Sequence, residues 1–68
     1  MPVARVTEII SSSTKSFEHA IEQGIARAVK TLQNVEGAWV KEQKVLLKDG
    51  KISEYRVDLK VTFILIEE

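Results

Sequence analysis

The segment Tyr55-Arg56-Val57-Asp58-Leu59-Lys60-Val61-Thr62-Phe63-Ile64-Leu65 alternates apolar and polar residues over most of its length. Successive side chains of a β-strand point to opposite faces of a sheet, so this alternation predicts a strand with one apolar and one polar face. The rule breaks at Ile64 and Ile66, which place apolar side chains on the polar face. A chain this short has little to cover them, and we expect them to meet another subunit.

The segment before this strand predicts a β-hairpin. Asp49-Gly50 is the strongest turn signal of the chain, because a two-residue type I′ turn needs positive φ at both central positions. The preceding residues, Ala38 to Leu47, include strand formers such as Trp39 and Val45. We therefore expect this second strand to pair antiparallel with the last one.

The N-terminal half predicts one further strand and one helix. Val3 to Ile10 is rich in β-branched residues and ends at a cluster of serines. Apolar residues then recur at spacings of three and four, which predicts an amphipathic helix from Thr14 to Gln33 with Ser13 as its N-cap. Gly24 costs up to about 1 kcal/mol in a helix relative to alanine, so it indicates close packing of the helix on the sheet.

The element order is therefore β-α-β-β, and we expect residues 1–68 to form a single α+β domain. A right-handed crossover from the first strand through the helix to the second leaves a central slot, which the third strand fills. The result is a three-stranded antiparallel sheet packed on one helix. The other sheet face and both sheet edges stay free for contacts with other subunits.

Composition excludes several function classes. Ten Lys and Arg balance ten Asp and Glu, so no net charge attracts nucleic acid, and the absence of cysteine rules out disulfides and thiolate metal sites. No segment approaches the twenty apolar residues that a bilayer requires, and the start lacks a signal-peptide pattern. We expect a cytoplasmic protein that binds neither nucleic acid nor membrane. A domain this small without disulfides favours self-association.

The chain also lacks the residues of a catalytic site. His19 is the only histidine and is expected to face solvent on the helix, while the serines near it suit capping better than nucleophilic attack. The three glycines do not form a phosphate-binding spacing. No acid, base and nucleophile can be combined from one chain, so we expect no enzyme and no catalytic residue.

Taken in order, these segments resemble the dodecin family, whose small subunits form hollow homo-oligomeric shells of twelve copies and bind flavins between subunits. The resemblance rests on Val6 to Ile10 followed by Ser13, on the helix segment from Ala20 to Ala28, and on the strand from Tyr55 to Phe63. It implies a dodecin-like β-α-β-β subunit, a homododecamer, and a role in ligand binding, storage or buffering.

The resemblance also indicates where a ligand would bind. Flavin-binding dodecins carry a Trp at the start of the second strand and a Gln after the aromatic residue of the third, and Gly37 and Arg56 occupy these positions here. Glycine offers no ring on which a flavin can stack, and Arg has donors but no acceptor. Trp39 stands two residues later on the same strand face, about 6.6 Å from Gly37. We expect Gly37, Trp39 and Arg56 to mark the site, with riboflavin, FMN or FAD bound weakly or not at all.

Three alternatives stay open. The first is an anionic ligand such as coenzyme A, with Arg56 contacting the anion and Trp39 stacking on the ligand. The second is a site for divalent cations on symmetry axes, formed by the acids Glu42, Asp58, Glu67 and Glu68. Three lysines are interleaved with these acids and favour surface salt bridges instead: Lys41, Lys44 and Lys60. The third is a purely structural shell.

Overall fold

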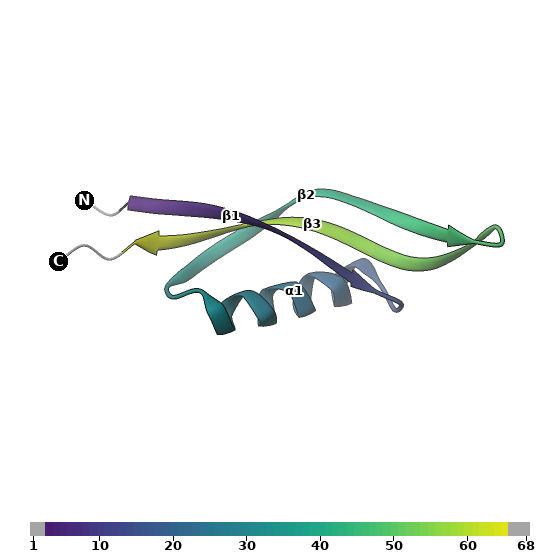
Figure 1. Cartoon of the computed structure of the whole chain (residues 1–68), viewed down its shortest axis with the longest axis horizontal. Coiled ribbons are helices and arrows are strands. Elements are labelled where there is room, and N and C mark those ends of the chain that lie inside the picture. Colours follow the sequence, from purple (N-terminus) through teal and green to yellow (C-terminus); the bar gives the residue numbers. More distant parts are fainter. Residues whose placement is uncertain (1–2, 66–68) are drawn as a thin grey trace.

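The computed structural model describes residues 3–65, which form a three-stranded antiparallel sheet with one helix on one of its faces (Figure 1). The strands are β1 (Val3–Ser13), β2 (Val35–Lys48) and β3 (Lys51–Leu65), and the helix is α1 (Phe17–Thr31). Both outer strands pair antiparallel with the central β3. The predicted α+β fold and the central position of the last strand are confirmed. Ile66, Glu67 and Glu68 lie outside the described residues.

All three strands are longer than their apolar patterns predict. β1 continues through its serines, because Ser11 and Ser13 keep their places in the ladder opposite Val57 and Tyr55. β2 and β3 likewise extend almost to the tip of their hairpin. Backbone hydrogen bonds between strands do not depend on side-chain type, so the ladder extends past the apolar residues that start it.

The predicted helix start at Thr14 with Ser13 as N-cap is wrong. The helix begins at Phe17, and its N-cap is Ser16, whose Oγ accepts a hydrogen bond from the backbone N–H of His19 at 3.0 Å. Ser13 instead ends β1, and its Oγ accepts from the backbone N–H of Lys15 at 2.9 Å. This local turn holds the chain outside the helix for three more residues. The helix also ends earlier than predicted, at Thr31.

The hairpin turn matches its sequence signal. Asp49 and Gly50 have φ angles of 53° and 77°, so both central residues adopt the left-handed conformation that a type I′ turn requires. In Figure 1 the β2–β3 hairpin projects beyond both α1 and the end of β1.

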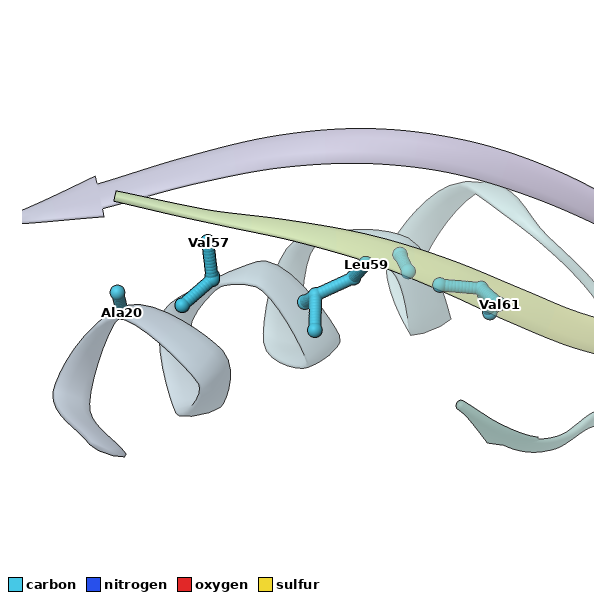
Figure 2. Packing of buried hydrophobic residues seen from close by; sticks show 5 residues of the cluster. Ala20, Val57, Leu59 and Val61 are labelled. Carbon is cyan, nitrogen blue, oxygen red and sulfur yellow. The ribbon is translucent and has the colours of Figure 1, made fainter. Parts of the chain in front are cut away.

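The core is a thin layer between β3 and the helix. Figure 2 shows Val57, Leu59 and Val61 of β3 gathered with Ala20 of α1. A Cβ added to Gly24 would lie 2.8 Å from Cδ1 of Leu59 and 3.1 Å from Cβ of Ser11, distances that real Cβ atoms rarely show. The prediction that Gly24 allows close packing of the helix on the sheet is confirmed.

Since Val57, Leu59 and Val61 face the helix, the residues that alternate with them point to the opposite side, which we call the open face. The β2 strand contains register shifts between Val35 and Gly37, between Val40 and Glu42, and between Leu46 and Leu47. Cross-strand partners share a face, so the registers assign twelve central positions to the open face: Val6, Glu8, Ile10, Ser12, Gly37, Trp39, Glu42, Lys44, Arg56, Asp58, Lys60 and Thr62.

The chain is extended for its size. Its radius of gyration is 14.1 Å, whereas a compact domain of this length has about 11 Å. Its dimensions are 54 × 19 × 13 Å. Within the described part, α1 is too short to cross a membrane.

Candidate functional site

The open face carries all three residues that the sequence indicates as ligand-binding. Gly37 lies opposite Thr62 and Trp39 lies opposite Lys60, so both β2 residues point away from the helix. Arg56 lies on the same face of β3, between Ser12 of β1 and Lys44 of β2. The sheet therefore displays the predicted residues together on one surface.

Gly37 and Trp39 leave free space on this surface. A Cβ added to Gly37 would meet no atom within 4 Å, so a larger side chain fits there without displacing a neighbour. The Trp39 side chain is half exposed, with 50% of its surface open to solvent. An aromatic ring with a free face can stack on a flat ligand or pack against a second subunit.

Arg56 is fixed by contacts on its own sheet. Its Nε donates a hydrogen bond to Oγ of Ser12 at 3.1 Å, and Nη2 lies 3.7 Å from Oε1 of Glu54. Lys44 stands directly across on β2. A guanidinium held in this way is pre-organised to bind an anion with its remaining donors.

One chain does not bring Trp39 and Arg56 into contact. Trp39 pairs with Lys60, which lies four residues along β3 from Arg56, a separation of about 13 Å. A single ligand that touches both side chains must span this distance or bind where two copies of the chain meet.

Between these two positions lies a cluster of charged side chains that we call the ion cluster: Glu8, Lys41, Glu42, Asp58 and Lys60. Nζ of Lys41 is 3.6 Å from one Glu8 oxygen, and Nζ of Lys60 is 3.9 Å from the other. Of the three lysines expected to form surface salt bridges, Lys41 and Lys60 do so, but with Glu8 rather than with Glu42 or Asp58. Alternation from Trp39 already places Lys41 on the open face, and the bulge between Val40 and Glu42 places Glu42 on that face as well. No residue pattern indicates where such a bulge falls.

The carboxyl groups of the ion cluster differ in their affinity for protons. A hydrogen bond from Asp58, with support from Lys41 and Lys60, lowers the pKa of Glu8. The hydrogen bond to Glu8 raises the pKa of Asp58, and desolvation and the negative charges of Glu8 and Glu42 act in the same direction. Among the described residues, no group of three or more His, Cys, Asp or Glu is placed to hold a metal ion.

The open face borders one cavity, and a larger groove lies beside the helix. The cavity, of about 100 Å³, lies on the open face beside Arg56, Lys44 and Asp58. The groove, of about 540 Å³, runs between β1 and α1 and is lined by residues such as Ile9, Gly24 and Ala28. No residue pattern indicates this groove, because it depends on how far the helix lies from the edge strand.

His19 is half-buried rather than solvent-facing as predicted. A hydrogen bond of 2.7 Å joins its Nδ1 to Oγ of the buried Ser13, across the junction of β1 and α1. The pair closes the turn that precedes the helix, which is a structural role for both side chains.

Comparison with protein families gives one consistent result. The dodecin family model matches residues 3–65. A dodecin from Thermus thermophilus is 35% identical over 65 residues, which make up 96% of this chain and 94% of the relative.

Solved structures agree. The dodecin from Streptomyces davaonensis has a TM-score of 0.91 and 39% identity, and the match covers 97% of each chain. Calcium dodecin from Mycobacterium tuberculosis, described as a calcium-chelating immunodominant antigen with a novel calcium-binding site, has a TM-score of 0.82 and 33% identity. That match covers 97% of this chain and 94% of the relative.

Proposed function

The chain belongs to the dodecin family, and from this premise we propose that it is a non-enzymatic shell subunit whose open face binds a small ligand where copies meet. The observation that carries the proposal is the surface of the single chain. It exposes 5165 Å², about 800 Å² more than a compact protein of 7.7 kDa. A standard interface buries about 800 Å² on each partner.

The exposed apolar side chains support the same proposal. Ile10 is 66% exposed, and Trp39 and Val6 on the same open face are about half exposed. Large apolar side chains with this much exposed surface are typical of subunit contacts. Closed symmetry leaves no contact surface unpaired, and membership of the dodecin family supports twelve copies, so we propose a closed homododecamer.

Native mass spectrometry tests the assembly. A dodecamer has a mass of about 92 kDa, twelve times the 7.7 kDa of the chain. A protein that stays monomeric or dimeric at micromolar concentration would contradict the proposal. Additional mass on the assembled species would also identify a ligand carried through purification.

For the ligand, we propose that flavin binding is weak or lost. Gly37 provides no stacking ring at the position where flavin-binding relatives have Trp, and Arg56 replaces a Gln that both donates and accepts. The open space at Gly37 supports the view that a ring could be restored there without disturbing the sheet.

Fluorescence titration with riboflavin tests this assignment. The wild type should bind weakly, and the double variant Gly37→Trp/Arg56→Gln should bind at least tenfold more tightly, a gain of about 1.4 kcal/mol or more. Ala38→Trp is a matched control, because residue 38 pairs with buried Val61 and so places the same ring on the helix side of β2. Tight binding by the wild type, or no gain in the double variant, would contradict the assignment.

A second candidate, an anionic ligand such as coenzyme A, is favoured by the fixed guanidinium of Arg56 beside Lys44. Comparison of FMN with riboflavin isolates the phosphate group. The wild type should prefer FMN, and Arg56→Ala should remove this preference while Lys48→Ala at the hairpin leaves it unchanged. Equal affinities for FMN and riboflavin in the wild type would show that Arg56 does not contact the phosphate.

A further inference from the structure

Three carboxyl groups stand close together on the open face, one from each strand. Asp58 of β3 lies directly opposite Glu42 of β2. Glu8 of β1 lies opposite Lys60, one position along the same face, so it is the diagonal neighbour of Asp58. Like charges in directly opposed positions of a sheet repel each other, so this arrangement needs a compensating group.

Two nearby lysines form ion pairs with Glu8, whereas Asp58 feels only the more distant charge of Lys41, which lowers its pKa less than its other neighbours raise it. Lys41 and Lys60 approach the two oxygens of Glu8, at 3.6 and 3.9 Å. Oδ1 of Asp58 is buried and accepts no hydrogen bond from any described residue. A buried carboxylate oxygen without a donor is unfavourable, whereas a protonated carboxyl group can itself donate to Glu8.

The other charged groups around Asp58 offset its negative charge only in part, since the charge of Lys41 lowers its pKa but the net shift is upward. Arg56, two residues before it on β3, is bound to Ser12 and Glu54. Helix α1 packs on the opposite face of the sheet, so its charges do not face Asp58. The charged groups that share the open face around Asp58 are Glu8 from β1, Lys41, Glu42 and Lys44 from β2, and Arg56 and Lys60 from β3.

We propose that Glu8 and Asp58 form a proton-binding site in which one proton is shared across the β1–β3 ladder, with Asp58 donating to the Glu8 carboxylate. The site couples the stability of the sheet to pH. It involves no ligand and does not depend on the proposed flavin or anion binding.

The direction of the coupling follows from the opposite pKa shifts of the two groups. Folding lowers the pKa of Glu8. Glu8 therefore stabilises the folded state at pH values above the ordinary Glu pKa, and this stabilisation is lost as pH falls through the lowered pKa. The pKa of Asp58 is raised, so folding takes up a proton there and stability falls as pH rises from the ordinary value through the raised one. The pair therefore stabilises the sheet most between the two shifted pKa values, where one proton is shared.

Thermal denaturation of the wild type and Asp58→Asn across acidic to mildly alkaline pH, at one protein concentration, tests the proposal. The asparagine amide donates to Glu8 at every pH, so the variant should have the higher Tm at pH 8. Its advantage should shrink as pH falls and Asp58 regains its proton. Asp49→Asn is the matched control, because the same change in the hairpin turn keeps a residue that tolerates positive φ and should give no such pH dependence.

Carbon-13 NMR of the side-chain carboxyl groups gives a direct readout that needs no variant. In the wild type, Asp58 should titrate above the ordinary Asp pKa and Glu8 below the ordinary Glu pKa. In Glu8→Ala, the midpoint of Asp58 should move down. Titration of Asp58 at or below the ordinary value, or a Tm of Asp58→Asn at or below the wild-type value at pH 8, would overturn the proposal.

Discussion

At the scale of single residues, Gly24 is the position where the packing leaves no room for a side chain. Gly24→Ala should lower the free energy of unfolding by about 1 kcal/mol, because overpacking costs roughly 1–3 kcal/mol and better helix propensity returns up to about 1 kcal/mol. The new Cβ would press on Leu59, which is 1% exposed and has little room to move. Urea denaturation at fixed protein concentration measures the loss.

Gly37→Ala is the natural control for this change. It also adds one methyl group, but to a strand position where nothing lies within 4 Å. It should leave stability unchanged or raise it slightly, because alanine loses less backbone freedom on folding than glycine. A stabilising effect of Gly24→Ala would mean that the helix lies farther from the sheet than the structure indicates.

At the scale of elements, the β2–β3 hairpin depends on its turn. Gly50 has a φ of 77°, and an L-residue in the left-handed region costs roughly 1–2 kcal/mol. Gly50→Ala should therefore lower Tm and speed amide exchange in the projecting part of the hairpin, while exchange in α1 changes less. Equal loss of protection in the hairpin and in α1 would show that the hairpin does not open independently of the rest of the chain.

The elements also show where sequence patterns stop being informative. The serines that end β1 are poor strand formers, yet they continue the strand because β3 offers backbone partners there. Ser13 and Ser16 are equally good caps by residue type, and the choice between them depends on the turn that Ser13 makes with Lys15.

At the scale of the whole molecule, folding and assembly should be coupled. Among residues 3–65 only five apolar residues are buried within the single chain, so little of its stability comes from its own core. Apparent Tm should therefore fall on dilution over a hundredfold range of concentration, because assembly stabilises the folded state by mass action. Differential scanning fluorimetry measures this shift.

Mass photometry or native mass spectrometry over the same dilutions should show the smaller species appearing as Tm falls. A Tm that does not depend on concentration while the mass changes would contradict the coupling. It would mean that the thin core between α1 and β3 is sufficient to hold the single chain folded.

Residue patterns alone predict the order of the elements, the central strand, the hairpin turn and the face of the sheet that carries Gly37, Trp39 and Arg56. The central strand follows from the right-handed crossover rule, and the other features follow from local rules: apolar periodicity, turn residues with positive φ, and the two-residue repeat of a strand. The resemblance to dodecins pointed to the same residues, and the family comparisons confirmed the family.

The helix start, the bulge at Lys41, the groove beside β1 and the diagonal placement of Glu8 beside Asp58 emerge only from the three-dimensional structure. Each of these depends on which residues stand opposite one another once the strands are in register. Glu8 and Asp58 are fifty residues apart in sequence and look like ordinary surface acids until the β1–β3 ladder makes them diagonal neighbours. The register describes how two strands pair, so it cannot be predicted from the residue pattern of either strand alone.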